Sequence, residues 1–600
     1  IVCGKERPLT SVSGLTLQLH YEHLKDYDKA EGGQDFLCYY QGIQRIEENP
    51  EKYDGNADKN QRLLDKVFLK SILTDINEDG ILVTCTIKQE NVTTIYENVH
   101  TFMQPRRAKV KKEKFKETGG WHKNPDMLNL VIIGTDATSR LNLLRHLPKT
   151  YKYLTEELGA LDFRGFNKVG DNTDPNLLAG LMGWSMEEFK EQKICHPKGN
   201  SKYDDCPLIW KDFSNKGYVT AYAEDAPWMG LFHYNQIGYV KEPTDYYNRP
   251  YYRTSEDHIS HNAGLGGLNG KICQGRKFGI EVIRDWNLDF LAANKDVPVF
   301  SFTWSAALTH DYLTMASLAD EPHLEHLKTL KNEGHLNNTV LVFISDHGQR
   351  WGSIRSTYVG MLEERLPFLY LVFPPWFREK YPLPWFNMVA NTRRLATFFD
   401  LHSTMKAIID QDYTKESLSD YRMGTGQSLF VKIPLNRTCK SAGIPQHYCS
   451  CEETEELDPK TLEVHKAANF VIEDINNGLK NFPLCAQLKL KEITGARFGK
   501  PNNSTIPKDG NGIVHRYQVT FITTPGEALM EATVRKDNKE LKMSSEASRI
   551  NKYGDQSHCI NDFIYRKYCY CNDLLTPIEK QQQLLNTMAH KNKTLISNKI

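Results

Sequence analysis

The sequence has no apolar run of the length that a membrane-spanning helix requires, about 18 residues or more. Basic and acidic residues are equal in number, at 75 each, so no excess charge favours nucleic acid as a partner. No signal peptide is visible at Ile1. We therefore expect either a removed signal sequence or a membrane anchor upstream of this chain, and the sequence leaves both open.

Cys-x-x-Cys pairs, which zinc-binding modules use, are also absent. The thirteen cysteines are instead spread along the chain with a cluster near its C-terminus, and this pattern favours disulfide bonds. We expect Cys38 to pair with Cys85. Because thirteen is an odd number, one cysteine should stay unpaired or pair outside this chain.

Six Asn-x-Ser/Thr sequons accompany the cysteines. They start at Asn91, Asn337, Asn436, Asn502, Asn503 and Asn592. Such sequons carry N-glycans only in proteins that enter the secretory route. Together with the cysteines they predict a secreted glycoprotein, or the luminal or extracellular part of a membrane-anchored one.

A chain of 600 residues is long enough for two or three domains. We expect a β-rich region over 1–118, a large α/β domain over 119–480, a small disulfide-containing α+β domain over 481–575 and a tail over 576–600. The basic run 106–116 reads as a solvated linker or exposed strand, and the alternative is a patch for anionic glycans or lipid head groups.

The α/β domain contains an apolar run, Val340 to Ile344, that ends in Asp346, His347 and Gly348. Such a run predicts a strand buried on both faces, as in a parallel sheet. Its polar residues would then lie at the carboxyl end of the strand, where open α/β sheets bind their ligands. Asp346 and His347 are therefore candidate metal ligands, although a plain strand followed by a turn explains the same residues.

A second apolar strand, Leu128 to Ile133, leads to Asp136 and then to a helix-like spacing of leucines. Asp136 and Asp346 can meet only if their two strands are neighbours. A third segment places Thr173 just before an Asp-Pro pair at a helix start, where the positive end of the helix dipole suits a nucleophile that attacks an anionic ester. Capping by Asn172, Thr173 or Asp174 is the alternative.

The order and spacing of Asp136, Thr173 and Asp346-His347-Gly348 resemble the alkaline phosphatase and sulfatase superfamily. Gly217 to Tyr222 is similar to the Gly-Tyr-x-Thr strand of sulfatases. Five segments more closely resemble the sulfatase-like animal family DUF229: Val169-Gly-Asp-Asn-Thr173, Tyr222-Ala-Glu-Asp225, Ser345-Asp-His-Gly348, Glu363-Glu-Arg-Leu-Pro367 and Asp400-Leu-His-Ser-Thr404. The resemblance implies an alkaline-phosphatase-like, doubly wound, mostly parallel sheet flanked by helices, with β-rich additions at both ends.

The resemblance also implies a divalent metal held by Asp136, Asp346, His347 and the Thr173 hydroxyl. Zinc is the expected ion, with manganese or calcium as alternatives. Thr173 would be the nucleophile. Because the Cys/Ser-x-Pro-x-Arg motif of sulfatases is absent, the resemblance favours a phosphoester hydrolase or a phospho-group transferase over a sulfatase.

Further site residues follow from the same comparison. His310 is the candidate for holding the substrate phosphate or protonating the leaving group, and a histidine in a polar loop is the alternative. Ala306 stands where two-metal members have an aspartate, so a second metal site looks incomplete. We expect Asn172, Arg140, Glu224 and Asp225 at the substrate, with Glu224 and Asp225 facing a cation or an ammonium group, or pairing with Arg140.

The predicted substrate is therefore an anionic ester, such as a phosphorylated glycan or a lipid head group. The alternative from a different class is a catalytically silent sulfatase-like ectodomain that binds a glycan or a protein. The four residues Asp136, Thr173, Asp346 and His347 favour the enzyme, because a silent scaffold has no need of all of them.

Overall fold

The computed structural model describes residues 1–27, 36–46, 58, 61–88, 91–191, 203–234, 236, 238–414, 426–499, 515–537, 540–562, 564–578 and 580–581. The chain forms two compact units. The first contains Ile1–Gln349 and Leu366–Arg437, and the second contains Arg350–Arg365 and Thr438–Ile600. The division at 118, 480 and 575 that the sequence suggested stays a prediction.

The first unit begins with small antiparallel sheets. Their strands are β1 (Thr10–Ser13), β2 (Thr16–Leu19) and β6 (Ile72–Leu73) in one sheet, and β4 (Gln61–Leu63), β3 (Leu37–Arg45), β7 (Gly80–Lys88), β8 (Val92–Thr101) and β5 (Val67–Leu69) in another. Cys38 and Cys85 lie opposite each other on β3 and β7 and form the predicted disulfide bond. Cys3 forms a second disulfide bond with Cys273.

The basic run after these sheets is helical, so the expectation of a linker or exposed strand was wrong. Helix α1 covers Lys109–Glu117. Lysine and glutamate favour helices, and Lys111 bonds Asp245 at 2.6 Å while Phe115 packs edge-on against Trp121. The run is therefore partly tied to the protein surface.

The first unit is built around a seven-stranded sheet of described residues, in the order β10-β19-β18-β9-β17-β12-β13. Its strands are β10 (Leu161–Asp162), β19 (Leu369–Val372), β18 (Thr339–Ile344), β9 (Asn129–Thr135), β17 (Val299–Ser305), β12 (Val219–Glu224) and β13 (Tyr246–Tyr247). The strands β18, β9, β17, β12 and β13 are parallel, and β19 runs antiparallel to β18. The predicted mostly parallel α/β sheet is confirmed.

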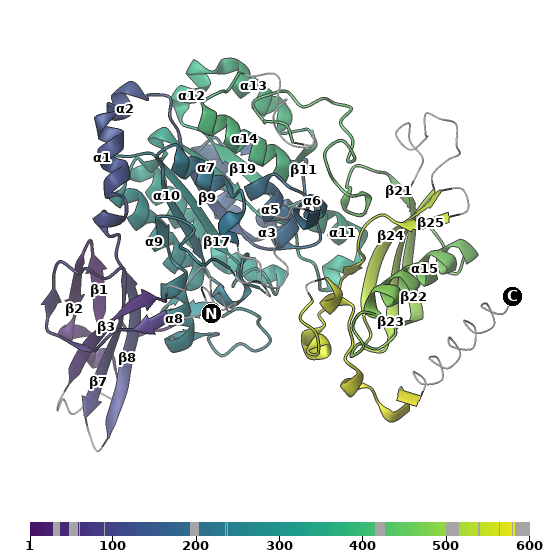
Figure 1. Ribbon diagram of the computed structural model, residues 1–600, viewed down its shortest axis with the longest axis horizontal. Helices are drawn as coiled ribbons and strands as arrows, with labels where there is room; N and C mark the ends of the chain where they lie inside the picture. Colours follow the sequence, from purple (N-terminus) through teal and green to yellow (C-terminus); the bar gives the residue numbers. More distant parts are fainter. Residues whose placement is uncertain are drawn as a thin grey trace. The chain divides into compact units, whose positions relative to one another are not determined.

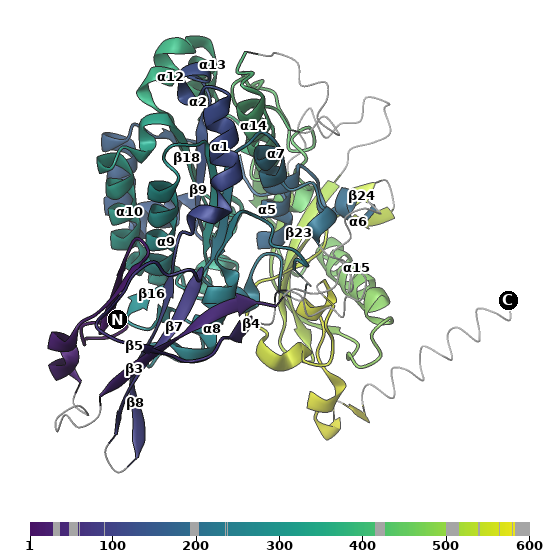
Figure 2. The ribbon, with the colours of Figure 1, turned by 60° about the vertical axis from the view of Figure 1, so that its left-hand side comes forward.

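Helices cover both faces of this sheet (Figure 1). One face carries α3 (Arg140–His146), α9 (Gly279–Ala293) and α10 (Asp320–Asn332), and the other carries α5 (Thr173–Met182), α7 (Ile209–Asn215) and α14 (Phe398–Asp410). Val131 and Ile133 of β9 join the core beneath α3, α9 and α10, whereas Phe213 of α7 packs on Phe300 of β17. Figure 2 shows the same two layers from another side. Burial on both faces explains the unbroken apolar runs in the sequence.

The second unit is a separate α+β body. Its antiparallel strands are β21 (Thr454–Glu456), β22 (Lys489–Gly499), β23 (His515–Thr524), β24 (Leu529–Asp537), β25 (Glu540–Met543) and β26 (Ser548–Arg549). Helix α15 (Leu462–Leu479) packs its apolar face, including Val471 and Ile475, against Val519 and Met530 of the sheet. Disulfide bonds join Cys439 with Cys449, Cys485 with Cys569 and Cys559 with Cys571.

A buried ion cluster holds helix α11 (Tyr358–Arg365) and the turn before it to this sheet. Arg355 forms two hydrogen bonds with Glu531 of β24, at 2.9 and 3.1 Å, and Arg365 lies 3.3 Å from the same carboxylate. All three residues are less than 5% exposed. Burial raises the pKa of Glu531, but the charge and hydrogen bonds of Arg355 outweigh it and hold the pKa well below its usual range.

We expect Glu531→Gln to destabilise the second unit by about 3–5 kcal/mol, because it removes the carboxylate that both buried arginines contact. Peptide-resolved hydrogen exchange over residues 515–549 would measure the loss. The exposed Glu540→Gln on β25 is the matched control and should change stability by no more than about 0.5 kcal/mol. Equal effects of the two variants would refute a stabilising role for the cluster.

Candidate metal centre and active site

The predicted acid residues meet at the carboxyl edge of the central sheet. Strands β9 and β18 are parallel neighbours, and Asp136 and Asp346 follow their ends. Three residues, Asp136, Asp346 and His347, each offer one possible metal-binding atom. These three atoms lie within 4.8 Å of one another. His347 Nε2 is 3.1 Å from Asp346 Oδ2 and 3.9 Å from Asp136 Oδ1. All three side chains are at least 96% buried.

The two oxygens of Asp346 have different surroundings. Oδ1 accepts hydrogen bonds from the backbone N–H of Ala137 at 3.0 Å and of His347 at 2.8 Å. Oδ2 is buried and accepts no hydrogen bond from the described part of the chain. A buried carboxylate oxygen without a donor is costly unless a cation faces it, so this oxygen fits a metal ligand.

The ring of His347 is oriented with one nitrogen toward the carboxylates of Asp136 and Asp346. Its Nδ1 lies 2.8 Å from the carbonyl oxygen of Gly348, which can only accept a hydrogen bond. Nδ1 therefore carries a proton, and Nε2 faces the two carboxylates. A histidine that donates one ring N–H to a carbonyl and offers the other nitrogen is the usual arrangement of a metal-bound histidine.

The backbone after Asp136 is held in an uncommon conformation that serves this arrangement. Ala137 has a φ of +54°, a region that costs a non-glycine residue about 1 kcal/mol or more. The turn aims the N–H of Ala137 at Asp346 and the N–H of Thr138 at Ser345 Oγ, 3.0 Å away. The turn after β9 thus fixes the Asp346 carboxylate, and Ser345 after β18 fixes the turn that follows Asp136.

This donor set fits a divalent transition metal. Two carboxylates and one imidazole are ligands that zinc and manganese accept. In a tetrahedral zinc site with bonds of about 2.0–2.2 Å, donor atoms lie roughly 3.3–3.6 Å apart. The observed 3.1 and 3.9 Å between His347 and the two carboxylates bracket that range.

Thr173 is the first residue of helix α5, as the sequence predicted for a helix start. Its neighbour Asn172 occupies the N-cap position, but its side chain makes no capping bond. Asn176 fixes the preceding loop instead, because its amide oxygen accepts from the N–H of Val169 at 2.7 Å and of Gly170 at 3.0 Å. Thr173 therefore follows a loop that Asn176 holds in place, and the residue is partly exposed. Its nucleophilic role stays a prediction.

His310 belongs to the loop that follows strand β17. Gln349, two residues after His347, donates from its side-chain amide to the carbonyl oxygen of His310 at 3.1 Å. His310 Nδ1 lies 3.5 Å from Asp311, whose carboxylate accepts two bonds from Asn269. The structure thus ties the His310 loop to the segment that carries the candidate ligands. The role of His310 in proton transfer stays a prediction.

The remaining predicted residues have partners within the protein. Asp225, after strand β12, accepts from Ser305 Oγ at 2.7 Å and from the N–H of Ala306 at 2.7 Å. Burial raises the pKa of Asp225 against these bonds. Glu224 accepts from the N–H of Leu231 at 2.9 Å. Arg140 pairs with both oxygens of Asp162, at 2.8 and 2.5 Å. Their contact with a substrate stays a prediction.

A row of hydrogen bonds links the ends of four strands. The Asp225 carboxylate holds Ser305, the carbonyl oxygen of Ser305 accepts from Asp136, and Asp346 holds Ala137. The sequence analysis assigned no part at this edge to Ser305, or to Ser345, whose hydroxyl accepts from Thr138. Ser345 stood inside the Ser-Asp-His-Gly segment, which was the signal that could have identified it. Ser305 carried no such signal.

A buried histidine contacts the last residue of strand β9 by a hydrogen bond. His323 Nε2 lies 2.9 Å from the hydroxyl of Thr135, the residue before Asp136. Burial lowers the pKa of His323 from 6.5 to about 3. Between these values the unfolded chain binds a proton that the folded chain does not bind. Its contribution to stability is therefore complete above pH 6.5 and decreases as the pH falls towards 3.

We expect His323→Gln to reduce the acid sensitivity of folding. The wild-type histidine should cost about 2 kcal/mol between pH 7 and pH 5, at roughly 1.4 kcal/mol per pH unit below 6.5. Denaturant unfolding at both pH values would measure this difference. The exposed His122→Gln should leave the pH dependence unchanged, and an identical dependence in all three proteins would contradict the assignment.

Several predictions concern other surfaces of the chain. Asn91, Asn337 and Asn436 are exposed, whereas Asn502, Asn503 and Asn592 lie outside the described residues. Among the described cysteines, Cys451 alone is free. No described helix is both long and apolar enough to cross a membrane.

The geometry defines an α/β protein with a buried Asp-Asp-His centre at its sheet edge. The chain belongs to the family described as protein of unknown function (DUF229), whose model matches residues 1–494. The family resemblance that the sequence motifs indicated is thereby confirmed. No curated protein matches the chain.

Solved structures of low identity are similar over much of the chain. A protein of the alkaline phosphatase superfamily from Vibrio parahaemolyticus is 12% identical, with a TM-score of 0.35 over 70% of this chain and 82% of that one. The sulfatase PsFucS1 from Pseudoalteromonas sp. is 13% identical, with a TM-score of 0.33 over 60% and 79%. The C-terminal periplasmic domain of EcEptC from Escherichia coli is 13% identical, with a TM-score of 0.33 over 56% and 91%. Likeness at this level assigns no activity to the chain.

Proposed function

We propose that this protein is a metal-dependent phosphoester hydrolase or phospho-group transferase that uses Thr173 as its nucleophile. One observation carries the proposal. Asp136, Asp346 and His347 converge at the carboxyl edge of neighbouring strands, with Asp346 Oδ1 and His347 Nδ1 held by the protein and Asp346 Oδ2 left for a cation. Thr173 would complete this ligand set.

The residues of the chain divide the reaction between them. A divalent cation bound here would lower the pKa of a coordinated hydroxyl and offset the negative charge of the ester. Thr173 Oγ releases its proton to solvent and attacks phosphorus as an alkoxide, so that an Oγ–P bond forms while the bond from phosphorus to the alcohol oxygen breaks. His310 supplies the proton that the departing alcohol needs.

The second half of the reaction regenerates Thr173. Water, or an acceptor alcohol in a transferase, attacks the phosphorylated threonine, and the Oγ–P bond breaks with Thr173 leaving as the alkoxide that starts the next cycle. His310, now without its proton, removes one from the attacking hydroxyl. Asn176 contributes by fixing the loop before Thr173, so that the hydroxyl is positioned before the substrate binds.

Phosphate esters are favoured over sulfate esters because Thr173 replaces the Cys or Ser of the sulfatase motif. The substrate would be a phosphorylated glycan or a lipid head group, met outside the cell or in a luminal compartment. The disulfide bonds agree with an oxidising location. Glycans at the exposed Asn91, Asn337 and Asn436 belong to the same proposal.

Purified protein should be stripped with a chelator, reloaded with zinc or manganese and assayed on bis(p-nitrophenyl) phosphate and p-nitrophenyl sulfate. We expect phosphodiester hydrolysis that depends on the added metal and exceeds sulfate hydrolysis. Faster sulfate hydrolysis would replace the proposal with a sulfatase. Absence of metal binding and of turnover would favour the silent ectodomain instead.

A further inference from the structure

A free thiol lies beside a disulfide bond in the second unit. Cys439 and Cys449 are joined, and Cys451 is free and exposed. The three Sγ atoms lie within 4.8 Å of one another. Thiol–disulfide exchange needs a free cysteine next to a bridge, and these three cysteines provide both. Burial raises the pKa of the Cys451 thiol, so we expect exchange at alkaline pH.

We propose that Cys439, Cys449 and Cys451 form a thiol–disulfide exchange site that takes low-molecular-weight disulfides, of the glutathione disulfide class, at its free thiol. In the internal step, the Cys451 thiolate attacks Cys439 Sγ. A bond forms between Cys439 and Cys451, the bond from Cys439 to Cys449 breaks, and the electron pair leaves with Cys449 as a thiolate. Bond count and oxidation state are unchanged, so no oxidant is consumed.

The external step follows the same chemistry. The free thiolate attacks one sulfur of the small disulfide and forms a mixed disulfide, while the other half leaves as a thiolate. Attack of Cys451 on Cys449 Sγ is the less favourable internal route, because it would close a strained bridge across Ser450 alone. The bridge therefore moves between Cys449 and Cys451, and Cys439 is the shared partner.

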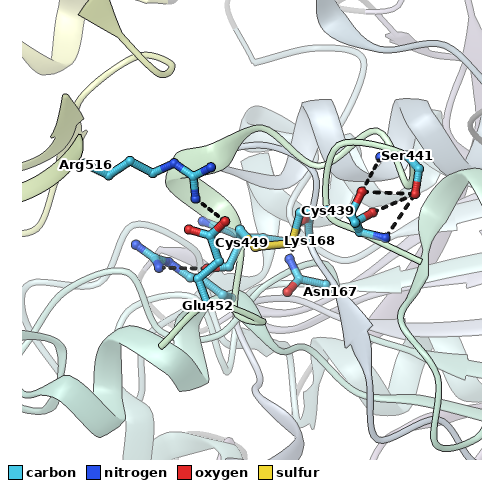
Figure 3. The surroundings of a disulfide bond; sticks show 9 residues. Asn167, Lys168, Cys439, Ser441, Cys449, Glu452 and Arg516 are labelled. Carbon is cyan, nitrogen blue, oxygen red and sulfur yellow. Dashed lines mark hydrogen bonds and ion pairs between the residues drawn. A yellow bond between two sulfur atoms is a disulfide. The ribbon is translucent and has the colours of Figure 1, made fainter. Parts of the chain in front are cut away.

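The surroundings explain why the bridge to Cys449 is the one observed. Cys439 lies in a turn that contains hydrogen bonds between Thr438 and Ser441 (Figure 3). Its carbonyl oxygen accepts from the N–H of Ile444 at 2.9 Å. His447, two residues before Cys449, bonds Thr533 at 2.9 Å through one ring nitrogen. Hydrogen bonds thus hold the segments that carry Cys439 and Cys449. In the proposed internal step the exposed Cys451 is therefore the residue that moves toward Cys439.

Exchange would alter a pocket of the second unit. Cys449 and Glu452 line this pocket together with Arg365 and Arg516. The carbonyl oxygen of Cys449 accepts from Arg365 at 3.2 Å, and Glu452 pairs with Arg516 (Figure 3). Release of Cys449 from its bridge would loosen this wall, next to the arginine that binds Glu531.

The test uses two isotopic forms of one alkylating reagent on the intact wild-type protein. Protein held at pH 8 for increasing times receives the light form, is then unfolded and reduced, and receives the heavy form. Fragmentation of the peptide that contains both Cys449 and Cys451 shows which one was free. We expect light label on Cys449 to rise with time while that on Cys451 falls by the same amount. Light label confined to Cys451 at all times would overturn the proposal.

Two further measurements do not depend on the equilibrium between the bridges. In Cys449→Ser, we expect Cys439 and Cys451 to join, so that no light label enters either residue, whereas two free thiols would overturn the proposal.

With glutathione disulfide, wild-type protein should gain one glutathione, and Cys451→Ser should gain none. The cluster in which Cys559 Sγ lies 3.7 Å from Cys569 Sγ is the internal control, because both belong to complete disulfide bonds and should stay unlabelled.

Discussion

Thr173→Ala is expected to lower the rate of phosphodiester hydrolysis by about 10⁴-fold or more, which is the scale on which loss of a nucleophile acts. Alanine lacks the hydroxyl oxygen that would bond to phosphorus, while the helix that starts at this residue keeps its backbone. Residual turnover should equal that of water attack in the same site. The steady-state rate with bis(p-nitrophenyl) phosphate is the measurement.

Thr173→Ser is the matched variant, because it keeps a hydroxyl at the same position. It should retain far more activity than the alanine protein, with kcat reduced more than KM is changed, since the lost methyl group affects orientation of the attack. The exposed Thr118→Ala should behave as wild type. Full activity in Thr173→Ala would remove Thr173 from the mechanism and leave the Asp-Asp-His centre to be explained separately.

Asp346→Asn is expected to remove both the metal and the activity. Asparagine can still accept hydrogen bonds from Ala137 and His347 through its oxygen, so the fold at this edge should survive. Its NH₂ group would then stand in place of Oδ2 and cannot bind a cation. We expect metal affinity to fall by more than the ~10–100-fold that loss of a supporting residue costs, and activity by at least about 10³-fold.

The control for this variant is Asp410→Asn, at the exposed end of helix α14 in the same unit. It removes one carboxylate from the surface without touching the sheet edge, so metal content and activity should match wild type. Elemental mass spectrometry would measure the metal content per chain. Thermal unfolding of the two variants should show equal stability. An Asp346→Asn protein that still binds one metal tightly would show that another residue is the ligand.

The sequence predicted the fold best where burial of a strand determines the pattern of apolar residues. Strands buried on both faces give unbroken apolar runs, so the strands now seen as β9 and β18 could be predicted, and with them the positions of Asp136 and Asp346 at a carboxyl edge. That the two strands are neighbours could not be derived from either run. Pairing between strands more than 200 residues apart depends on the whole topology, which only the family resemblance supplied.

Other features depend on tertiary contacts that leave no local signal. The hydrogen bonds that Asp225 accepts from Ser305 and Ala306 join the ends of two different strands, and nothing in the sequence around Asp225 indicates them. The basic run over 106–116 was read by its charge, although its lysines and glutamates favour a helix. The turn before helix α11 bonds strand β24 through Arg355 and Glu531, which are 176 residues apart. No spacing rule predicts such a pair.

The most direct test of the account is to identify the phosphorylated residue during turnover. Metal-loaded and chelator-treated protein would each be mixed with bis(p-nitrophenyl) phosphate, quenched in acid within a single turnover and digested for mass spectrometry. The account predicts one added phosphoryl-ester group on Thr173 in the metal-loaded protein and none in the stripped protein. Turnover without modification of Thr173, or modification that is independent of the metal, would contradict it.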